Sequence, residues 1–200
     1  TPAVNSSERK ILTSWHASFR LPVRITESKR ETSYVYDTYG NITLFRVKDT
    51  ATNAARAWNT SYSYHPSIPG VILQKTENGP RKDVTDVTTT DYYAPDATCV
   101  GGHLGCRGQV ASIANALGHV TQITRYNAHG QPEEIIDPNG LATTLTYDVR
   151  QRLLSRTSRT EITSYQYDGV GQLKKIILPD SSFLSYNYDA AHRLTDITDN

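Results

Sequence analysis

The residues of this chain that could carry chemistry are two cysteines, six histidines and a recurring aspartate. Cys99 and Cys106 flank a glycine-rich stretch that contains His103. A loop of this length could bring the two sulfurs to disulfide distance, or the two thiols could stay free. With His103 they offer three zinc-binding side chains, but no fourth ligand follows at metal-site spacing. We therefore predict no metal site.

The histidines and aspartates do not form a recognisable catalytic motif. None of the histidines lies in an H-E-x-x-H motif or beside a serine in a nucleophile elbow; they are His16, His65, His103, His119, His129 and His192. An aspartate that recurs at one position of a repeat is better explained as a turn cap, because its carboxylate can bond its own backbone two residues on. We predict no catalytic and no cofactor-binding residue.

Tyr-Asp dipeptides mark a repeat of about 20–21 residues. Five tyrosines define position zero: Tyr36, Tyr126, Tyr147, Tyr167 and Tyr188. Position +1 is Asp37, Asn127, Asp148, Asp168 and Asp189; position +4 is Gly40, Gly130, Gln151, Gly171 and His192; position +6 is Ile42, Pro132, Leu153, Leu173 and Leu194. Agreement of several columns over five copies indicates a structural repeat.

Each repeat contains two turn signals and two short alternating segments. Asp168-Gly169-Val170-Gly171 is typical of one turn, and Asp137-Pro138-Asn139-Gly140 is typical of the other. Tyr165 and Tyr167 alternate with Gln166, as in a strand with two different faces. The sequence therefore predicts an all-β fold, in which consecutive antiparallel β-hairpins pair side by side into one curved, continuous sheet.

The remaining segments are assigned according to how closely their sequences match this repeat pattern. We expect a single repeat region over 1–200, with an irregular lead-in at 1–31, a first repeat at 32–50, degenerate repeats at 51–114 that include the loop 99–106, and regular repeats at 115–200. Residues 8–19 could form a short helix or a loop. Residues 51–58 have helical composition but more readily form an enlarged turn, and His65 stands where a repeat usually has aspartate.

Composition excludes some function classes. The net charge of +1 gives no basic field for a phosphate backbone, so we expect no nucleic-acid binding. No apolar run is long enough for a membrane helix, and no secretion signal opens the chain. The chain has no methionine, so we expect it to be an internal piece of a longer polypeptide.

The segments Tyr165–Leu173, Tyr186–Leu194 and Tyr34–Ile42 resemble the Y-x-Y-D-x-x-G-R/N-L unit of the RHS (rearrangement hot spot), or YD-repeat, family. The likeness is strong over 115–200 and 32–47 and weaker over 60–114. The loop 99–106 is also similar to segments of bacterial members. The family includes bacterial polymorphic-toxin shell proteins and is related to insecticidal toxin-complex shells and teneurins.

The resemblance implies a strip of hairpins from a hollow shell that encloses a C-terminal toxin or variable domain, used in competition between bacteria. The implied partners are the remaining shell repeats, the enclosed domain, and secretion-spike or adaptor proteins. The implied location is outside the cell or on its surface, reached through a dedicated system such as type VI secretion. The alternative is an adhesion module that binds proteins or, through tyrosine rings, carbohydrates. Neither is an enzyme.

The segment Asp137–Leu141 resembles a self-cleavage motif of the family. Bacterial relatives cleave themselves with an aspartate near a D-P-x-G-L motif at the end of the shell, and Asp137-Pro138-Asn139-Gly140-Leu141 is similar to it. Here three in-phase repeats follow, at Tyr147, Tyr167 and Tyr188. We therefore interpret the segment as a turn.

Overall fold

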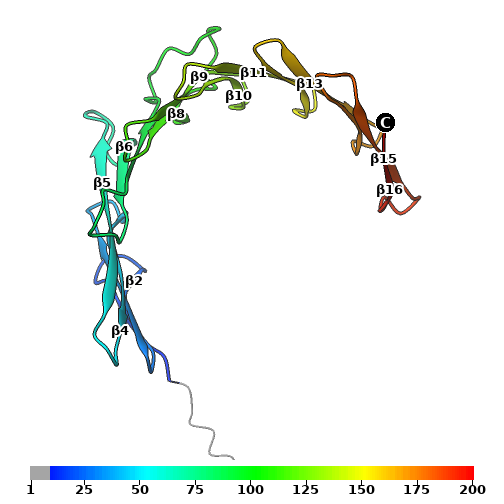
Figure 1. The fold of residues 1–200 in the computed structure, drawn as a ribbon. Helices are drawn as coiled ribbons and strands as arrows, with labels where there is room; N and C mark the ends of the chain where they lie inside the picture. Colours follow the sequence, from blue (N-terminus) through cyan, green and yellow to red (C-terminus); the bar gives the residue numbers. More distant parts are fainter. Residues whose placement is uncertain (1–9) are drawn as a thin grey trace, which may run out of the picture. The chain divides into compact units, whose positions relative to one another are not determined.

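The computed structural model describes residues 10–200, and it confirms the all-β prediction. These residues form sixteen strands and no helix, so none of them belongs to a helix that could cross a membrane. Each strand pairs antiparallel with the next one along the chain wherever a register is defined. Figure 1 shows this order as a colour gradient that passes from strand to strand.

The described chain divides into two compact units, residues 10–92 with 113–118, and residues 93–112 with 119–200. The strands of the first unit are β1 (Leu12–Trp15), β2 (Pro22–Thr26), β3 (Arg30–Tyr36), β4 (Ile42–Asp49), β5 (Ala55–Tyr64), β6 (Ile72–Asn78) and β7 (Val87–Tyr92). β8 (Val110–Ala114) has residues in both units. That residues 1–200 make one continuous repeat region stays a prediction.

The second unit carries the regular repeats. Its strands are β9 (Val120–Tyr126), β10 (Pro132–Ile136), β11 (Ala142–Tyr147), β12 (Leu153–Ser158), β13 (Glu161–Tyr167), β14 (Leu173–Ile177), β15 (Phe183–Tyr188) and β16 (Leu194–Asp199). Each of the tyrosines that end β9, β11, β13 and β15 is followed by a turn and the next strand. The predicted spacing of strands and turns is therefore confirmed over this unit.

A register shift recurs beside the tyrosine of each repeat. In β13 the shift lies between Gln166 and Tyr167, and Tyr167 pairs with Leu173 of β14. The same shift precedes Tyr147 and Tyr188. A bulge of this kind bends its strand and increases the local twist. The repeat therefore sets curvature at one fixed position in every hairpin.

The two faces of the sheet differ in chemistry. In the first unit Tyr34 pairs with Phe45 and Phe45 with Trp58, and the neighbouring ring centroids lie 5.4 and 5.1 Å apart. In the second unit Tyr165 pairs with Ile176, and Ile176 with Leu184. Because alternate residues face opposite sides, one face carries aromatic and aliphatic rows.

The opposite face is rich in small polar residues. In the second unit its rows include Thr146–Ser155–Ser164; in the first unit the row Ser33–Arg46–Ala57 mixes small side chains with an arginine. Asn59, Ser61 and Ser63 on this side of β5 are exposed. The hydrophobic contacts that stabilise each unit therefore lie on the tyrosine side.

Neither unit has the interior of an ordinary globular domain. Among residues 10–200 only four side chains are buried: Thr32, Cys99, Cys106 and Tyr126. Most side chains on the tyrosine face are thus only half-buried, because no second layer from residues 10–200 covers them within either unit.

Two local expectations need correction. Residues 12–15 form β1, which pairs with β2, where the sequence left a short helix or a loop open for residues 8–19; residues 8 and 9 lie outside the described residues. Residues 50–54 connect β4 to β5, with a turn at 50–52, and β5 begins at Ala55. The alanines lose their helical preference because Trp58 packs against Phe45 across the strands.

Candidate functional site

The repeated turn after each tyrosine is the feature on which the predicted functional residues converge. In the turn of Asp168, Oδ1 accepts hydrogen bonds from the backbone N–H groups of Val170 (3.0 Å), Gly171 (2.8 Å) and Gln172 (2.8 Å). The Asp168 N–H donates to the carbonyl of Gln172 at 3.0 Å. The aspartate therefore caps its turn, as the sequence predicts.

The other repeats show the same cap. In each, Oδ1 at position +1 accepts the N–H groups two and four residues later; the capping residues are Asp37, Asn127, Asp148 and Asp189. Asn127 shows that a neutral amide oxygen is sufficient. Position +4 has positive φ throughout: Gly40, Gly130, Gln151, Gly171 and His192. This left-handed conformation explains why glycine dominates that column.

The tyrosine hydroxyl joins each repeat to the one before it. Tyr167 donates to the Leu153 carbonyl at 3.0 Å, Tyr188 to the Leu173 carbonyl at 2.9 Å, and Tyr147 to the Pro132 carbonyl at 2.8 Å. The acceptor is in every case position +6 of the preceding repeat. The two most regular columns of the sequence are thus brought into direct contact.

The first two tyrosines of position zero form equivalent bonds. Tyr36 donates to the Pro22 carbonyl and Tyr126 to the Val110 carbonyl, each at 2.7 Å. Burial raises the pKa of Tyr126 to about 12, with a smaller contribution from Tyr93. The hydroxyls at these positions therefore remain protonated donors at physiological pH.

The turn hydrogen bonds also act on the capping carboxylates. Partial burial, the largest single influence, raises the pKa of Asp168, but the N–H donors of Gln172, Gly171 and Val170 together lower it below the ordinary value. Backbone and side-chain bonds from Arg193 lower the pKa of Asp189. These carboxylates are ionised acceptors, not proton donors poised for acid catalysis near neutral pH.

The family unit quoted above has R or N at position +5, but sequence reasoning assigned no role to this column, which comprises Asn41, Gln131, Arg152, Gln172 and Arg193. Gln131 Nε2 donates to the Gln151 carbonyl at 2.9 Å, and Gln172 Nε2 donates to the His192 carbonyl at 3.0 Å. Both bonds reach the positive-φ residue of the following repeat. The long polar side chains of Gln131 and Gln172 are therefore clamps between successive turns, and the recurrence of such residues directly before each strand was the available signal.

The clamp has an ionic version at Arg152. Its guanidinium pairs with its own turn cap, with Nε 2.7 Å from Asp148 Oδ2. The guanidinium also lies over the ring of Tyr167 in the next repeat, 4.4 Å from the centroid. One arginine thus contacts two neighbouring turns through a salt bridge and a cation–π interaction.

In the first unit the degenerate repeat keeps the cap with a different residue. His65 Nδ1 accepts the N–H groups of Ser67 and Ile68, each at 3.2 Å, so the histidine replaces aspartate as the sequence suggested. Tyr64 donates a short hydrogen bond to Asp37 Oδ2. Burial, followed by this bond, raises the pKa of Tyr64 to about 12.

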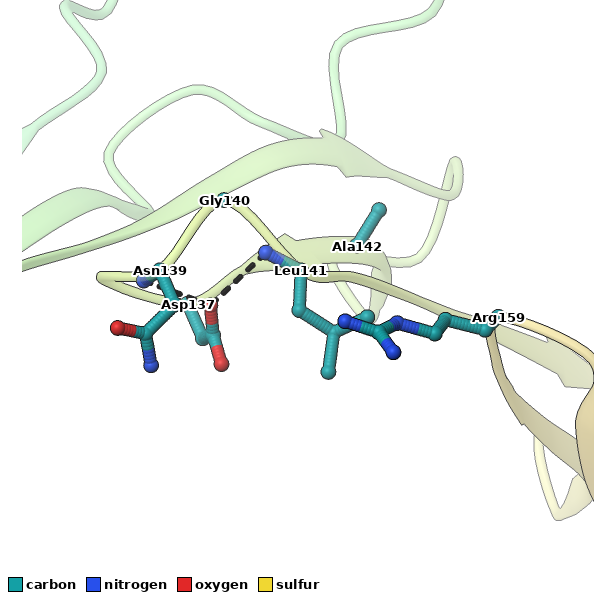
Figure 2. A pocket seen from close by; sticks show the side chains of 6 residues that line it. All are labelled: Asp137, Asn139, Gly140, Leu141, Ala142 and Arg159. Carbon is teal, nitrogen blue, oxygen red and sulfur yellow. Dashed lines mark hydrogen bonds between the residues drawn. The ribbon is translucent and has the colours of Figure 1, made fainter.

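Asp137 has the geometry of a turn cap. Its Oδ1 accepts the N–H groups of Asn139 and Leu141, each at 2.9 Å, and Figure 2 shows the bond to Leu141 beside an open hollow that Arg159 also lines. The segment connects β10 to β11. The carboxylate that resembles a self-cleavage residue is therefore engaged in holding a hairpin turn.

The structure joins Cys99 and Cys106 in a disulfide, with their Cα atoms 5.7 Å apart. His103 accepts the Gly105 N–H at Nδ1 (3.1 Å). Among residues 10–200 no cluster of three His, Cys, Asp or Glu side chains could hold a metal ion. The chemistry that this loop offers is therefore oxidation and reduction of the Cys99–Cys106 pair.

Comparison with known proteins agrees with this geometry. A model of the RHS Repeat family matches residues 126–164 and 167–200. No curated protein matches the chain. The chain is similar to the crystal structure of TcdB2-TccC3-TEV, with 15% identity, a TM-score of 0.57, and coverage of 95% of this chain and 11% of that one.

A second solved structure gives a similar result. TcdB2-TccC3 without its hypervariable C-terminal region matches with 17% identity, a TM-score of 0.51, and coverage of 90% of this chain and 10% of that one. At such identities the likeness shows the fold. The chain spans about a tenth of the proteins that it matches.

Proposed function

We propose, because residues 126–164 and 167–200 match the model of the RHS Repeat family, that the chain is a wall segment of a shell that encloses a C-terminal toxin or variable domain. The observation that carries the proposal is the hydroxyl-to-carbonyl bond that Tyr147, Tyr167 and Tyr188 repeat from one hairpin to the one before it. This bond lets successive hairpins extend a sheet laterally without forming the buried core of a globular domain.

The chemistry of the sheet supports a barrier. In each unit the sheet is a single layer with an aromatic and aliphatic face and a face rich in serine and threonine. The exposed turns are closed by internal hydrogen bonds, which leaves their polar groups satisfied. A wall of this kind can confine another polypeptide without reacting with it.

The disulfide supports an extracellular destination. Disulfides persist in oxidising compartments and are rare in the cytosol. We propose that the parent protein is exported by a bacterium through a dedicated secretion system, in association with a spike or adaptor protein. The remaining shell repeats and the enclosed domain are its other partners.

Protease protection of the enclosed domain tests the proposal. In the parent protein, the polypeptide that follows the repeats should resist digestion, and the triple change Tyr147→Phe/Tyr167→Phe/Tyr188→Phe should make it accessible. Tyr165→Phe is the matched control, because Tyr165 lies on the same strand as Tyr167 and its hydroxyl has no hydrogen-bond partner among the described residues. Equal digestion of all three proteins would reject the shell.

An adhesion module is the second candidate, and one observation favours it. The β1–β2 connection lines an open hollow with Trp15, Phe19 and Arg20, and Trp15 is 62% exposed. Aromatic rings beside a hydrogen-bond donor suit the apolar faces and hydroxyl groups of sugars. Binding of the chain to a glycan array, abolished by Trp15→Ala, would support this alternative, and absence of binding would exclude it.

A further inference from the structure

The segment 93–109, which we term the disulfide loop, supplies two of the three buried side chains that the second unit has among the described residues. Cys99, Cys106 and Tyr126 are 5%, 3% and 3% exposed, and Tyr93 and Ile123 pack against them. Tyr93 also meets the Tyr126 ring edge-on at 6.1 Å and donates its hydroxyl to the Ile123 carbonyl. The loop therefore covers the first tyrosine of the regular repeats.

The loop rests directly on the turn that follows Tyr126. A Cβ atom at Gly105 would overlap the carbonyl oxygen of Asn127, so only glycine fits at this contact. Gln109 lies close against Gly130 of the same turn. This close approach makes the loop a cap on the Asn127 turn, and the approach depends on the position of Gly105, next to Cys106.

Besides the disulfide, the hydrogen bonds inside the loop are mostly short-range ones, such as Gly102 N–H to the Cys99 carbonyl (3.1 Å) and Cys106 N–H to Cys99 Sγ (3.2 Å). Arg107 Nε donates across the loop to the Ala97 carbonyl (3.0 Å). The ends of the loop are closed by two backbone hydrogen bonds, Tyr93 N–H to Gln109 and Gly108 N–H to Tyr93, each 2.9 Å. Between them, Gly101 and Gly102 have positive φ; a Cβ added at Gly102 would meet nothing within 4 Å, whereas one at Gly101 would meet the His103 ring at 3.3 Å. Glycine gives an open loop high conformational entropy, and the sulfur–sulfur bond is the one covalent link that keeps Cys99 beside Cys106 and Tyr126.

We propose that the disulfide makes the loop a redox-controlled cap, which is closed over Tyr126 when Cys99 and Cys106 are oxidised and opens when they are reduced. The device does not require that the chain encloses a cargo. It gives the second unit a tightly packed state in an oxidising compartment and a loosened state in a reducing one.

The redox step is a thiol–disulfide exchange with a small monothiol such as glutathione. Since the cysteines are 5% and 3% exposed in the closed loop, exchange proceeds when the loop opens transiently: a glutathione thiolate attacks one sulfur, the bond between Cys99 and Cys106 breaks, and the other cysteine leaves as a thiolate. A second glutathione thiolate then attacks the mixed disulfide, which releases the second cysteine thiolate and glutathione disulfide. Two electrons pass from two glutathione molecules to the protein, and solvent protons neutralise the thiolates.

Limited trypsin digestion with and without reduced glutathione tests the cap on the intact chain. Arg107 is exposed in the loop, and Arg159 is exposed in the turn between β12 and β13. Loss of the constraint on a ring of this size changes a local opening equilibrium by about 60-fold. We expect reduction to accelerate cleavage after Arg107 by about that factor and to leave cleavage after Arg159 unchanged.

Three results of this digestion would overturn the proposal. An unchanged rate after Arg107 would overturn the proposal, and so would equal acceleration after Arg159, because the whole unit would then be loosened. The double change Cys99→Ala/Cys106→Ala should give the fast rate whether or not glutathione is present. A slow rate in that variant would also overturn the proposal.

A variant that leaves the sulfurs intact provides an independent test. Gly105→Ala should lift the loop from the Asn127 turn, so cleavage after Arg107 should accelerate in the oxidised protein. Gly169→Ala is the matched control, because Gly169 has ordinary φ and no atom within 4 Å of an added Cβ. If Gly105→Ala and Gly169→Ala behave alike, the loop is not a cap on this turn.

Discussion

The hydroxyl of Tyr167 should stabilise the contact between two repeats by about 1 kcal/mol, the typical net value of one hydrogen bond. The change Tyr167→Phe removes the 3.0 Å bond to the Leu153 carbonyl and keeps the ring. The guanidinium of Arg152 can still lie over that ring, 4.4 Å from its centroid. The variant therefore isolates the hydroxyl from the packing.

Amide hydrogen exchange followed by mass spectrometry measures this loss locally, which matters because repeat arrays need not unfold as one unit. Peptides that cover β12 and β13 should exchange about fivefold faster in Tyr167→Phe, since 1.4 kcal/mol corresponds to a factor of ten. Peptides that cover β3 and β4 should not change.

The matched control is Tyr165→Phe, which removes a hydroxyl without a hydrogen-bond partner from the same strand and the same face. Its exchange rates should stay close to those of the unchanged chain. If the two variants accelerate exchange equally, the stabilisation comes from general polarity of the tyrosine column, and the inferred link between repeats is wrong.

Three further outcomes follow from the turn and tyrosine geometry. Because hydrogen bonds hold the pKa of Asp168 below its ordinary value, its contribution to stability should be full above about pH 4 and should be lost as pH falls through the folded-state pKa. In urea titrations the variant Asp168→Asn should keep the cap and lose that acid dependence. The variant Asp168→Ala should lower the free energy of unfolding even at neutral pH. Because burial raises the pKa of Tyr126 to about 12, the contribution of its hydroxyl to stability should be full below about pH 10 and should disappear as pH rises to about 12. Ultraviolet titration of the chain and of the variant Tyr126→Phe would detect this ionisation. Gly171→Ala places a side chain at φ 102° and should lower the free energy of unfolding by about 1 kcal/mol, while Gly169→Ala should not; equal thermal melting of the two would contradict the assignment of backbone strain.

Much of the hairpin architecture could be predicted because the residues that specify it act locally. Asp168 caps its own turn and Gly171 supplies its own positive φ, so their spacing is visible in the sequence. The same logic extended to His65, whose ring nitrogen takes the place of a carboxylate oxygen. Turn chemistry of this kind needs no knowledge of distant contacts.

The features that the sequence did not predict depend on neighbouring repeats. Gln172 reads as an ordinary polar residue after a turn until its bond to the His192 carbonyl is seen. The alanines near residue 55 favour a helix, yet Trp58 is drawn into a strand by Phe45 of the previous one. The pairing of Cys99 with Cys106 was left open, because spacing alone does not distinguish a disulfide from two free thiols.

The tyrosine bonds have a direction along the polypeptide. Every hydroxyl at position zero reaches towards the amino terminus, from Tyr188 to Leu173 and from Tyr167 to Leu153. A hairpin can therefore lock onto its predecessor as soon as it is synthesised, without waiting for anything downstream. Such a chain can fold one repeat at a time, from its amino terminus onwards, as it leaves the ribosome or a narrow export channel.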